Sequence, residues 1–152
     1  RVIDVLLQMH IAQEETKFGL NKEELYEILD KLNDFPNVAV KGLMGMATFT
    51  EDVSKIKQEF NHLKSTFEES KIHSNLSKDF KTISMGMSGD YKEAIECGST
   101  MVRVGSSIFG VRNYNWSFGL SKINSLKASF LMVMTKKGFV IYKHCYLCIR
   151  GS

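Results

Sequence analysis

The chain has 152 residues, with 20 lysines and arginines against 17 aspartates and glutamates and a formal net charge of +3. This length fits one domain, and 43% hydrophobic with 24% charged residues excludes a disordered chain. The small net charge and the lack of an apolar run of ~18 residues indicate neither a nucleic-acid nor a membrane partner. Three cysteines are too few for a disulfide scaffold, so we expect a cytoplasmic protein.

The charge is divided unevenly along the chain. Residues 1–114 contain 14 basic and 17 acidic residues, a net of −3, whereas residues 115–152 contain six basic and no acidic residues, a net of +6. Acids scattered at random would leave such a stretch empty with a probability on the order of 1%. The composition therefore indicates two segments of different character.

The first elements of the chain are expected to be a strand and a helix. A short apolar run predicts a buried strand over Val2–Met9, and Asn21 with Glu24 has the spacing of a capping box. After the capping box, apolar residues recur on one face of a predicted helix, at Leu25, Ile28, Leu29 and Leu32. The segment Asn33–Pro36 ends this helix, because the residue before a proline disfavours helical backbone.

The alternation of strands and helices continues through residue 109. The expected elements, in chain order, are a strand Val38–Met44, a helix Glu51–Ser70, a loop Ile72–Lys78, a strand Phe80–Met85, a helix Asp90–Glu96 with Asp90 as N-cap and Gly98 after its end, and a strand Met101–Val104. Such an order predicts parallel strands joined by right-handed crossovers. Either half of a (β/α)₈ barrel or a small doubly wound sheet fits, and a full barrel needs ~250 residues. The basic segment instead predicts a β-hairpin of Phe130–Met134 and Phe139–Tyr142.

Two turns at strand ends have the residues of a phosphate site. Ser84–Asp90 is rich in glycine and serine, and Arg103–Ser107 places an arginine and a Gly-Ser-Ser turn before a helix. Free N–H groups at a helix start favour a phosphate, and barrels bind phosphate in the loops after their last two strands. A helix cap and an inter-element salt bridge by Arg103 are the structural alternatives. The histidines and the Cys145-x-x-Cys148 pair lack the spacing of a complete metal site, so no metal is expected.

Three segments resemble the signature of the pyridoxal phosphate homeostasis family of the YggS/PROSC type. They are SMGMSGD at 84–90, AIECGSTMVRVGSSIFG at 94–110 and Arg112-Asn113-Tyr114. The segment Gln8–Leu20 is similar to the family's Q-x-N…E-x-x-K-x-G pattern, with Lys17 and Gly19 in register and His10 where the family usually has Asn. The resemblance covers about residues 1–114 and none of the acid-free segment.

The resemblance implies a fold and a cofactor. The fold is an α/β fold, the C-terminal portion of a (β/α)₈ barrel of the alanine racemase N-terminal domain type, or fold type III. The cofactor is pyridoxal 5′-phosphate, whose Schiff-base lysine is expected on a strand before residue 1 and is absent here. By the same resemblance Met87 lines the pocket, Ser88 and the Gly105-Ser106 turn hold the phosphate, and Arg103 lies near the ring or the phosphate. Ser106 stands where many members carry threonine and retains the hydroxyl.

The function that the resemblance implies is a non-catalytic carrier or buffer in pyridoxal phosphate homeostasis, with pyridoxal phosphate-dependent apoenzymes as candidate partners. No catalytic residue is assigned, and without the lysine we expect weak or no binding by these 152 residues alone. One alternative is an amino-acid racemase-like enzyme. The other is an inert truncated fragment, with two open sheet edges. Residues 115–152 are interpreted as foreign to the family, as a frameshift, a retained intron or a gene-model error would produce.

Overall fold

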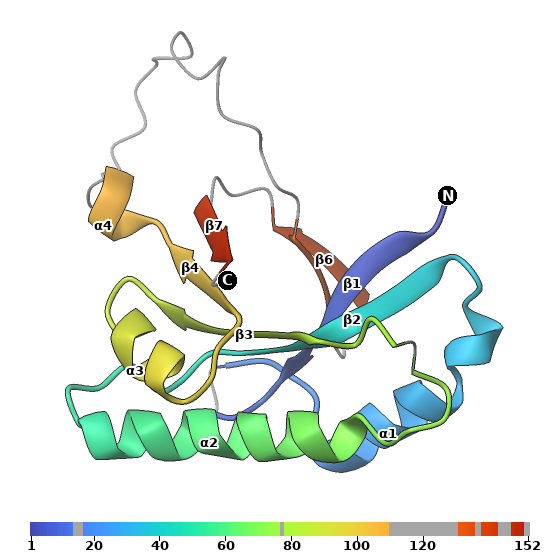
Figure 1. Cartoon of the computed structure of the whole chain (residues 1–152), viewed down its shortest axis with the longest axis horizontal. Coiled ribbons are helices and arrows are strands. Elements are labelled where there is room, and N and C mark those ends of the chain that lie inside the picture. Colours follow the sequence, from blue (N-terminus) through green and yellow to red (C-terminus); the bar gives the residue numbers. More distant parts are fainter. Residues whose placement is uncertain (14–16, 77, 110–130, 136–137, 143–146, 151–152) are drawn as a thin grey trace, which may run out of the picture.

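The computed structural model describes residues 1–13, 17–76, 78–109, 131–135, 138–142 and 147–150 (Figure 1). Its strands and helices alternate up to residue 109, as the sequence predicted. The elements are β1 Ile3–Met9, α1 Lys22–Asp30, a 3₁₀ helix Leu32–Asp34, β2 Val38–Gly45, α2 Val53–Ser70, β3 Thr82–Met87, α3 Tyr91–Glu96, β4 Met101–Val104, α4 Ser106–Phe109, β5 Leu131–Thr135, β6 Gly138–Tyr142 and β7 Leu147–Arg150.

The strands of the described residues form one seven-stranded sheet with the order β6-β5-β1-β2-β3-β4-β7. The pairs β1–β2, β2–β3 and β3–β4 are parallel, which confirms the expectation from the alternation. The helices α1, α2 and α3 lie on one side of this parallel sheet, as Figure 1 shows. The arrangement is α/β with a parallel sheet. Because β1 to β4 are parallel, their carboxyl ends lie together along one side of the sheet, and we call this row of strand ends the carboxyl edge.

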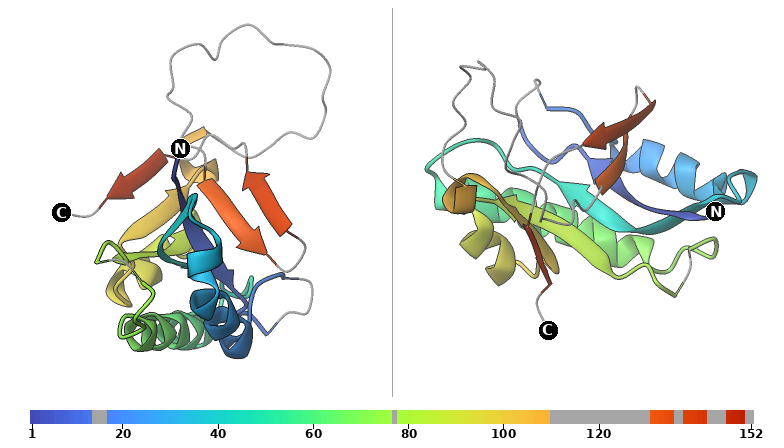
Figure 2. Two further views of the ribbon diagram at one scale, coloured as in Figure 1. Left: turned by 90° about the vertical axis from the view of Figure 1, so that its right-hand side faces the viewer. Right: turned by 90° about the horizontal axis from the view of Figure 1, so that it is seen from above.

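The acid-free segment contributes strands to both edges of the parallel sheet. The hairpin β5–β6 is antiparallel, as predicted, and β5 also pairs in parallel with β1. The strand β7, which the sequence analysis did not predict, pairs antiparallel with β4 (Figure 2). The strands β1 and β4 are therefore not edge strands. In the part of the chain that the structure describes, the sheet is still open, with β6 and β7 as its two edges.

The core lies between the sheet and its helices. The apolar face expected for α2 is confirmed, and its residues pack against alternate residues of the strands. The buried members of this helix face are Ile56, Phe60, Leu63 and Phe67. A smaller cluster around Leu6 and Met44, joined by Met46 and Met101, lies apart from this core. Among the described residues, no helix is long and apolar enough to cross a lipid bilayer.

The expected helix ends are confirmed with small differences. Asn21 caps α1 through a capping box with Glu24, in which each side chain binds the other residue's backbone N–H. The α-helix ends at Asp30, and the 3₁₀ helix takes up the residues before Pro36. At the end of α3, the N–H groups of Gly98 and Ser99 donate to carbonyls of the last turn, a Schellman closure.

The third strand extends two residues beyond the predicted end at Met85. Its pairing with β4 contains one extra residue between Ser84 and Met87, where Gly86 has φ +92°. A bulge with a left-handed glycine lets a strand continue while it changes direction. Alternation in the sequence does not reveal such a bulge, because it depends on the pairing with β4.

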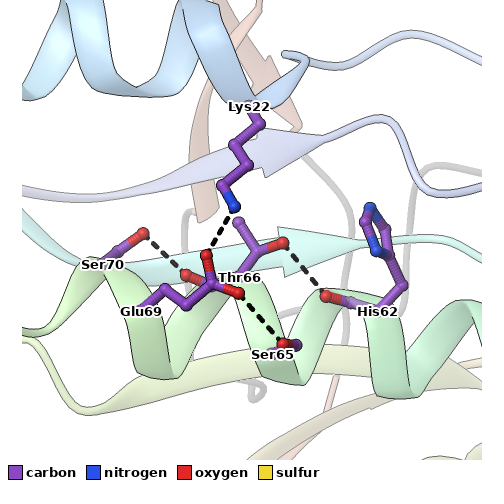
Figure 3. Close-up of polar contacts among 6 residues, drawn as sticks. All are labelled: Lys22, His62, Ser65, Thr66, Glu69 and Ser70. Carbon is purple, nitrogen blue, oxygen red and sulfur yellow. Dashed lines mark hydrogen bonds and ion pairs between the residues drawn. The ribbon is translucent and has the colours of Figure 1, made fainter.

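An ion pair joins α1 to α2 on the surface. Lys22 Nζ lies 2.5 Å from Glu69 Oε2, and the hydroxyl of Ser65 donates to Glu69 Oε1 (Figure 3). The hydrogen bond with Lys22 is the main cause that lowers the pKa of Glu69 and raises the pKa of Lys22. The pair therefore connects two helices that each pack on the sheet.

Replacing Gly86 with alanine tests the bulge. The new Cβ would lie 2.4 Å from Cβ of Ala94, in a backbone conformation that alanine rarely adopts. We expect the free energy of unfolding to fall by about 1–3 kcal/mol, measured from the urea midpoint. Gly89→Ala is the matched control, since its Cβ meets no atom within 4 Å and its effect should stay within about 0.5 kcal/mol. Equal midpoints for the two variants would contradict the bulge.

Titration of Glu69 tests the ion pair. Because the folded-state pKa of Glu69 is lowered, the stabilisation it brings is present above the unfolded pKa of about 4.3 and is lost as the pH falls through the folded pKa. In Lys22→Ala, NMR should find the pKa of Glu69 moved back up toward its ordinary value. Lys92→Ala, which changes an exposed lysine on α3, should leave it in place. A pKa of Glu69 unchanged by loss of Lys22 would show that the pair does not form.

Candidate functional site

The turn after β3 begins at a half-exposed methionine. Met87 is the last residue of the strand and is 38% exposed, and its backbone N–H donates to Asp90 Oδ1 at 2.6 Å. Asp90 holds the N-cap position of α3, as expected, but its carboxylate binds this preceding N–H and makes no side-chain bond to the helix. The short bond closes the turn Ser88–Asp90 and sets the direction in which Ser88 leaves the strand.

Ser88 connects this turn to the one that follows β4. Its Oγ accepts hydrogen bonds from the N–H of Gly105 at 3.1 Å and of Ser107 at 3.4 Å. In return the Ser107 hydroxyl donates to the backbone oxygen of Ser88 at 3.5 Å. The two glycine- and serine-rich turns are thus brought together, and we call the Ser88 hydroxyl with the N–H groups of Gly105 and Ser107 the Ser88 cradle. Ser106 starts α4 beside it and is exposed.

Arg103 lies beneath these turns and is buried, with 3% of its surface exposed. One guanidinium nitrogen donates to the backbone oxygen of Ser84 at 3.0 Å and to its Oγ at 2.7 Å. The other donates to the backbone oxygen of Gly45 at 3.0 Å. A buried guanidinium is tolerated only when its N–H groups find acceptors, so this side chain ties β4 to the middle of β3 and to the last residue of β2.

Part of the motif at 94–110 has a structural role. The Ser99 hydroxyl donates to the backbone oxygens of Met85 and Met101, and Thr100 Oγ1 accepts from the N–H of Ile83. These bonds hold the start of β4 against β3. Ser99 and Thr100 therefore align the two strands whose turns form the Ser88 cradle.

Leu20 lies beside the end of β1, where it bridges to Met9. Gln8 Nε2 donates to the backbone oxygen of Phe18 at 2.5 Å, and Leu20 N–H donates to the backbone oxygen of Gln8. Lys17 Nζ donates to the backbone oxygen of Ala47, in the loop that follows β2. Gln8 is 2% exposed, and its Oε1 is a buried acceptor without a partner in the described part of the chain. Of the positions similar to the family's Q-x-N…E-x-x-K-x-G pattern, Gln8 and Lys17 thus make hydrogen bonds to backbone oxygens near the carboxyl edge.

The sequence analysis missed a buried carboxylate. Glu59 of α2 binds Thr48 and Gln13, which belong to the loops after β2 and β1. A signal for it was present, because Glu59 lies three residues after Ile56 and directly before Phe60, within the apolar helix face. An acid at such a position indicates a buried, hydrogen-bonded side chain.

The arrangement at the carboxyl edge is suited to binding an anion. Two backbone N–H groups, those of Gly105 and Ser107, both donate to the Ser88 hydroxyl oxygen, and a tetrahedral anion can take the place of such an acceptor. Within the described ranges, no group of three or more histidine, cysteine, aspartate or glutamate residues could hold a metal ion. Cys145 of the Cys-x-x-Cys pair lies outside those ranges. Burial raises the pKa of the Cys97 thiol, so this thiol is a poor nucleophile.

Comparison with known proteins places the chain among relatives of similar sequence. The model of the family "alanine racemase, N-terminal domain" matches residues 1–113. The pyridoxal phosphate homeostasis protein of Pasteurella multocida is 36% identical over 113 residues, which cover 74% of this chain and 48% of that protein. The human protein of the same name is 39% identical over 115 residues, covering 74% and 42%. The chain spans about half the length of these curated relatives.

Solved structures agree with this comparison. The structure of PipY from Synechococcus elongatus with pyridoxal phosphate (PLP) bound is 26% identical, with a TM-score of 0.61 over 72% of this chain and 50% of that one. A protein from Bifidobacterium adolescentis is 33% identical, with a TM-score of 0.64 over 71% and 43%. Since the family model matches residues 1–113, well over half of the chain, the chain belongs to the alanine racemase N-terminal domain family.

Proposed function

We propose that residues 1–114 supply the phosphate-binding turns of a protein that binds pyridoxal 5′-phosphate and acts in intracellular pyridoxal phosphate homeostasis as a non-catalytic carrier or buffer. Without the Schiff-base lysine, binding by these 152 residues alone is expected to be weak and to depend on the phosphate. The observation that carries the proposal is the Ser88 cradle, in which Gly105 and Ser107 present N–H groups to the Ser88 hydroxyl. The printed names of the relatives and the PLP bound to PipY support the choice of this phosphate ester. Cytoplasmic location and pyridoxal phosphate-dependent apoenzyme partners belong to the same proposal.

The donors present at the carboxyl edge fit a phosphate group. The N–H groups of Gly105 and Ser107 would turn from Ser88 Oγ to phosphate oxygens, and the hydroxyls of Ser88, Ser106 and Ser107 would donate as well. Met87, being half-exposed next to the turn, would line the pocket, and Arg103 would contribute positive charge from below. When bound, pyridoxal phosphate supplies an aldehyde that reacts with amines.

We further propose that the described residues 1–109 are the later portion of a (β/α)₈ barrel. Four parallel strands with helices packed on one face, and a second apolar cluster of Leu6 and Met44 apart from the helices, support this interpretation. The cradle would then occupy the loops after the last two strands, where barrels bind phosphate. In agreement with a portion of a longer fold, this chain covers 43% of the Bifidobacterium adolescentis structure and 50% of the PipY structure.

Substitution of Ser88 tests the cradle. In Ser88→Ala the phosphate loses the charge-assisted hydrogen bond from the Ser88 hydroxyl. Part of this loss is offset, because the N–H groups of Gly105 and Ser107 no longer bind the serine. The net result should be a fall in the affinity for pyridoxal 5′-phosphate of about tenfold, or about 1.4 kcal/mol. Affinity is measured by equilibrium dialysis with absorbance detection. Pyridoxal, which has no phosphate, should show the same weak binding to both forms.

The same dialysis assay supplies the control and the results that would contradict the cradle. Ser54→Ala, which removes an exposed hydroxyl at the start of α2, should leave the affinity for pyridoxal 5′-phosphate unchanged. Equal affinities of wild type and Ser88→Ala, or equal affinities of wild type for the two ligands, would refute the cradle. Racemisation of an amino acid by the pyridoxal phosphate-loaded protein would refute the non-catalytic role and favour an enzyme of fold type III.

We propose a boundary near residue 114, after which the sequence is foreign to the family. The family model ends at residue 113, and residues 115–152 contain no acid, which together support the boundary. The pairing of β5 with β1 and of β7 with β4 is compatible with it, because exposed strand edges accept any chain of suitable pattern.

Sequencing of the transcript across codons 110–120 tests this boundary. We expect it to reveal a frameshift or an unspliced intron at this point. A clean in-frame message of normal abundance would contradict the proposal.

A further inference from the structure

A buried carboxylate holds the two loops that follow β1 and β2. Glu59 projects from α2 and is 5% exposed. Its Oε2 accepts from the N–H of Thr48 at 2.6 Å, and its Oε1 accepts from the Thr48 hydroxyl at 2.7 Å and from the N–H of Gln13 at 3.3 Å. Burial of a carboxylate is unfavourable unless donors surround it, so these three bonds specify its place.

The peptide group between Ala47 and Thr48 binds Glu59 through its N–H and a lysine through its oxygen. The N–H of the Ala47–Thr48 peptide donates to Glu59, and the oxygen of the same peptide accepts from Lys17 Nζ. An anion at the N–H and a cation at the oxygen polarise the peptide in the same direction, so each bond strengthens the other. Glu59 and Lys17 are therefore coupled although they do not touch.

The coupled lysine lies at the carboxyl edge. Lys17 belongs to the loop between β1 and α1, and Gln13, earlier in that loop, is bound by the same carboxylate. Ligands of α/β folds bind outside the carboxyl ends of the strands, and the Ser88 cradle lies at this same edge. The Glu59 contacts thus determine the position of one part of the rim around the candidate site.

We propose that Glu59 is a positioning residue, which fixes the ammonium group of Lys17 at the rim of the candidate site through the Ala47–Thr48 peptide. The inference rests on the proposed function only for the identity of the ligand at the candidate site. Loss of the negative charge removes the polarisation of the peptide and weakens its bond to Lys17, which makes the amine more accessible to a reagent. A purely structural role of Glu59 would lower stability without a selective effect on Lys17.

The test measures the reactivity of individual lysines toward an amine-acetylating reagent, with peptide mass spectrometry of the full chain. In Glu59→Gln the side chain keeps its size but loses its charge and one acceptor. We expect acetylation of Lys17 to accelerate by about fivefold, as after loss of an ordinary hydrogen bond. Exposed Lys31 and Lys92 in the same molecule are internal references and should not change.

Two control variants separate positioning from stability. Thr48→Val removes the hydroxyl that binds Glu59 but keeps the peptide N–H, so the path to Lys17 stays intact. Ile56→Val destabilises the same helix face without touching the network. In both, acetylation of Lys17 should stay within about twofold of wild type. An unchanged rate in Glu59→Gln, or an equal acceleration in Ile56→Val, overturns the proposal.

The coupling also has a reciprocal readout, which applies even where Glu59→Gln does not fold. In Lys17→Met, amide hydrogen exchange of Thr48 should accelerate by about fivefold, because the peptide loses its cation. Lys22→Met, a change of an exposed lysine at the start of α1, should not alter that rate. Unchanged exchange of Thr48 in Lys17→Met overturns the coupling. Neither readout involves pyridoxal phosphate, so failure of ligand binding is distinguished from failure of this inference.

Discussion

The buried guanidinium of Arg103 is the constraint on which the carboxyl edge depends. A charged group with 3% of its surface exposed must satisfy its N–H groups, and it does so with oxygens of Ser84 and Gly45. These bonds fix β4 against the middle of β3 and the last residue of β2. The turns that carry Ser88 and Gly105 follow β3 and β4, so strands held in this way bring the two turns within hydrogen-bond distance.

The motif residues divide into two groups with different roles. Ser99, Thr100 and Arg103 join strands and set their register, whereas Ser88 and Gly105 stand at the turns and present polar groups to one point. The Glu59 network performs the corresponding task on the other side of the edge, for the loops after β1 and β2.

The sequence pattern was sufficient to predict the strands and α-helices up to residue 104 and their parallel order, although it did not predict β7, and Asn21 and Gly98 marked the helix ends correctly. The features that it could not predict depend on contacts between distant residues. The bulge at Gly86 and the partner of the Asp90 carboxylate are set by the pairing of β3 with β4 and by the turn that follows it. The strands of residues 131–150 add to β1 and β4, and no local pattern says which edge a strand will join.

The central claim is that Ser88, Gly105 and Ser107 form one phosphate-binding point. Backbone amide shifts, recorded by NMR while pyridoxal 5′-phosphate is added to the full chain, test it most directly. The account predicts that the amides of Gly105 and Ser107 move together and saturably, and that pyridoxal at the same concentrations leaves them in place. Saturable shifts elsewhere in the chain, with these two amides unmoved, would contradict it.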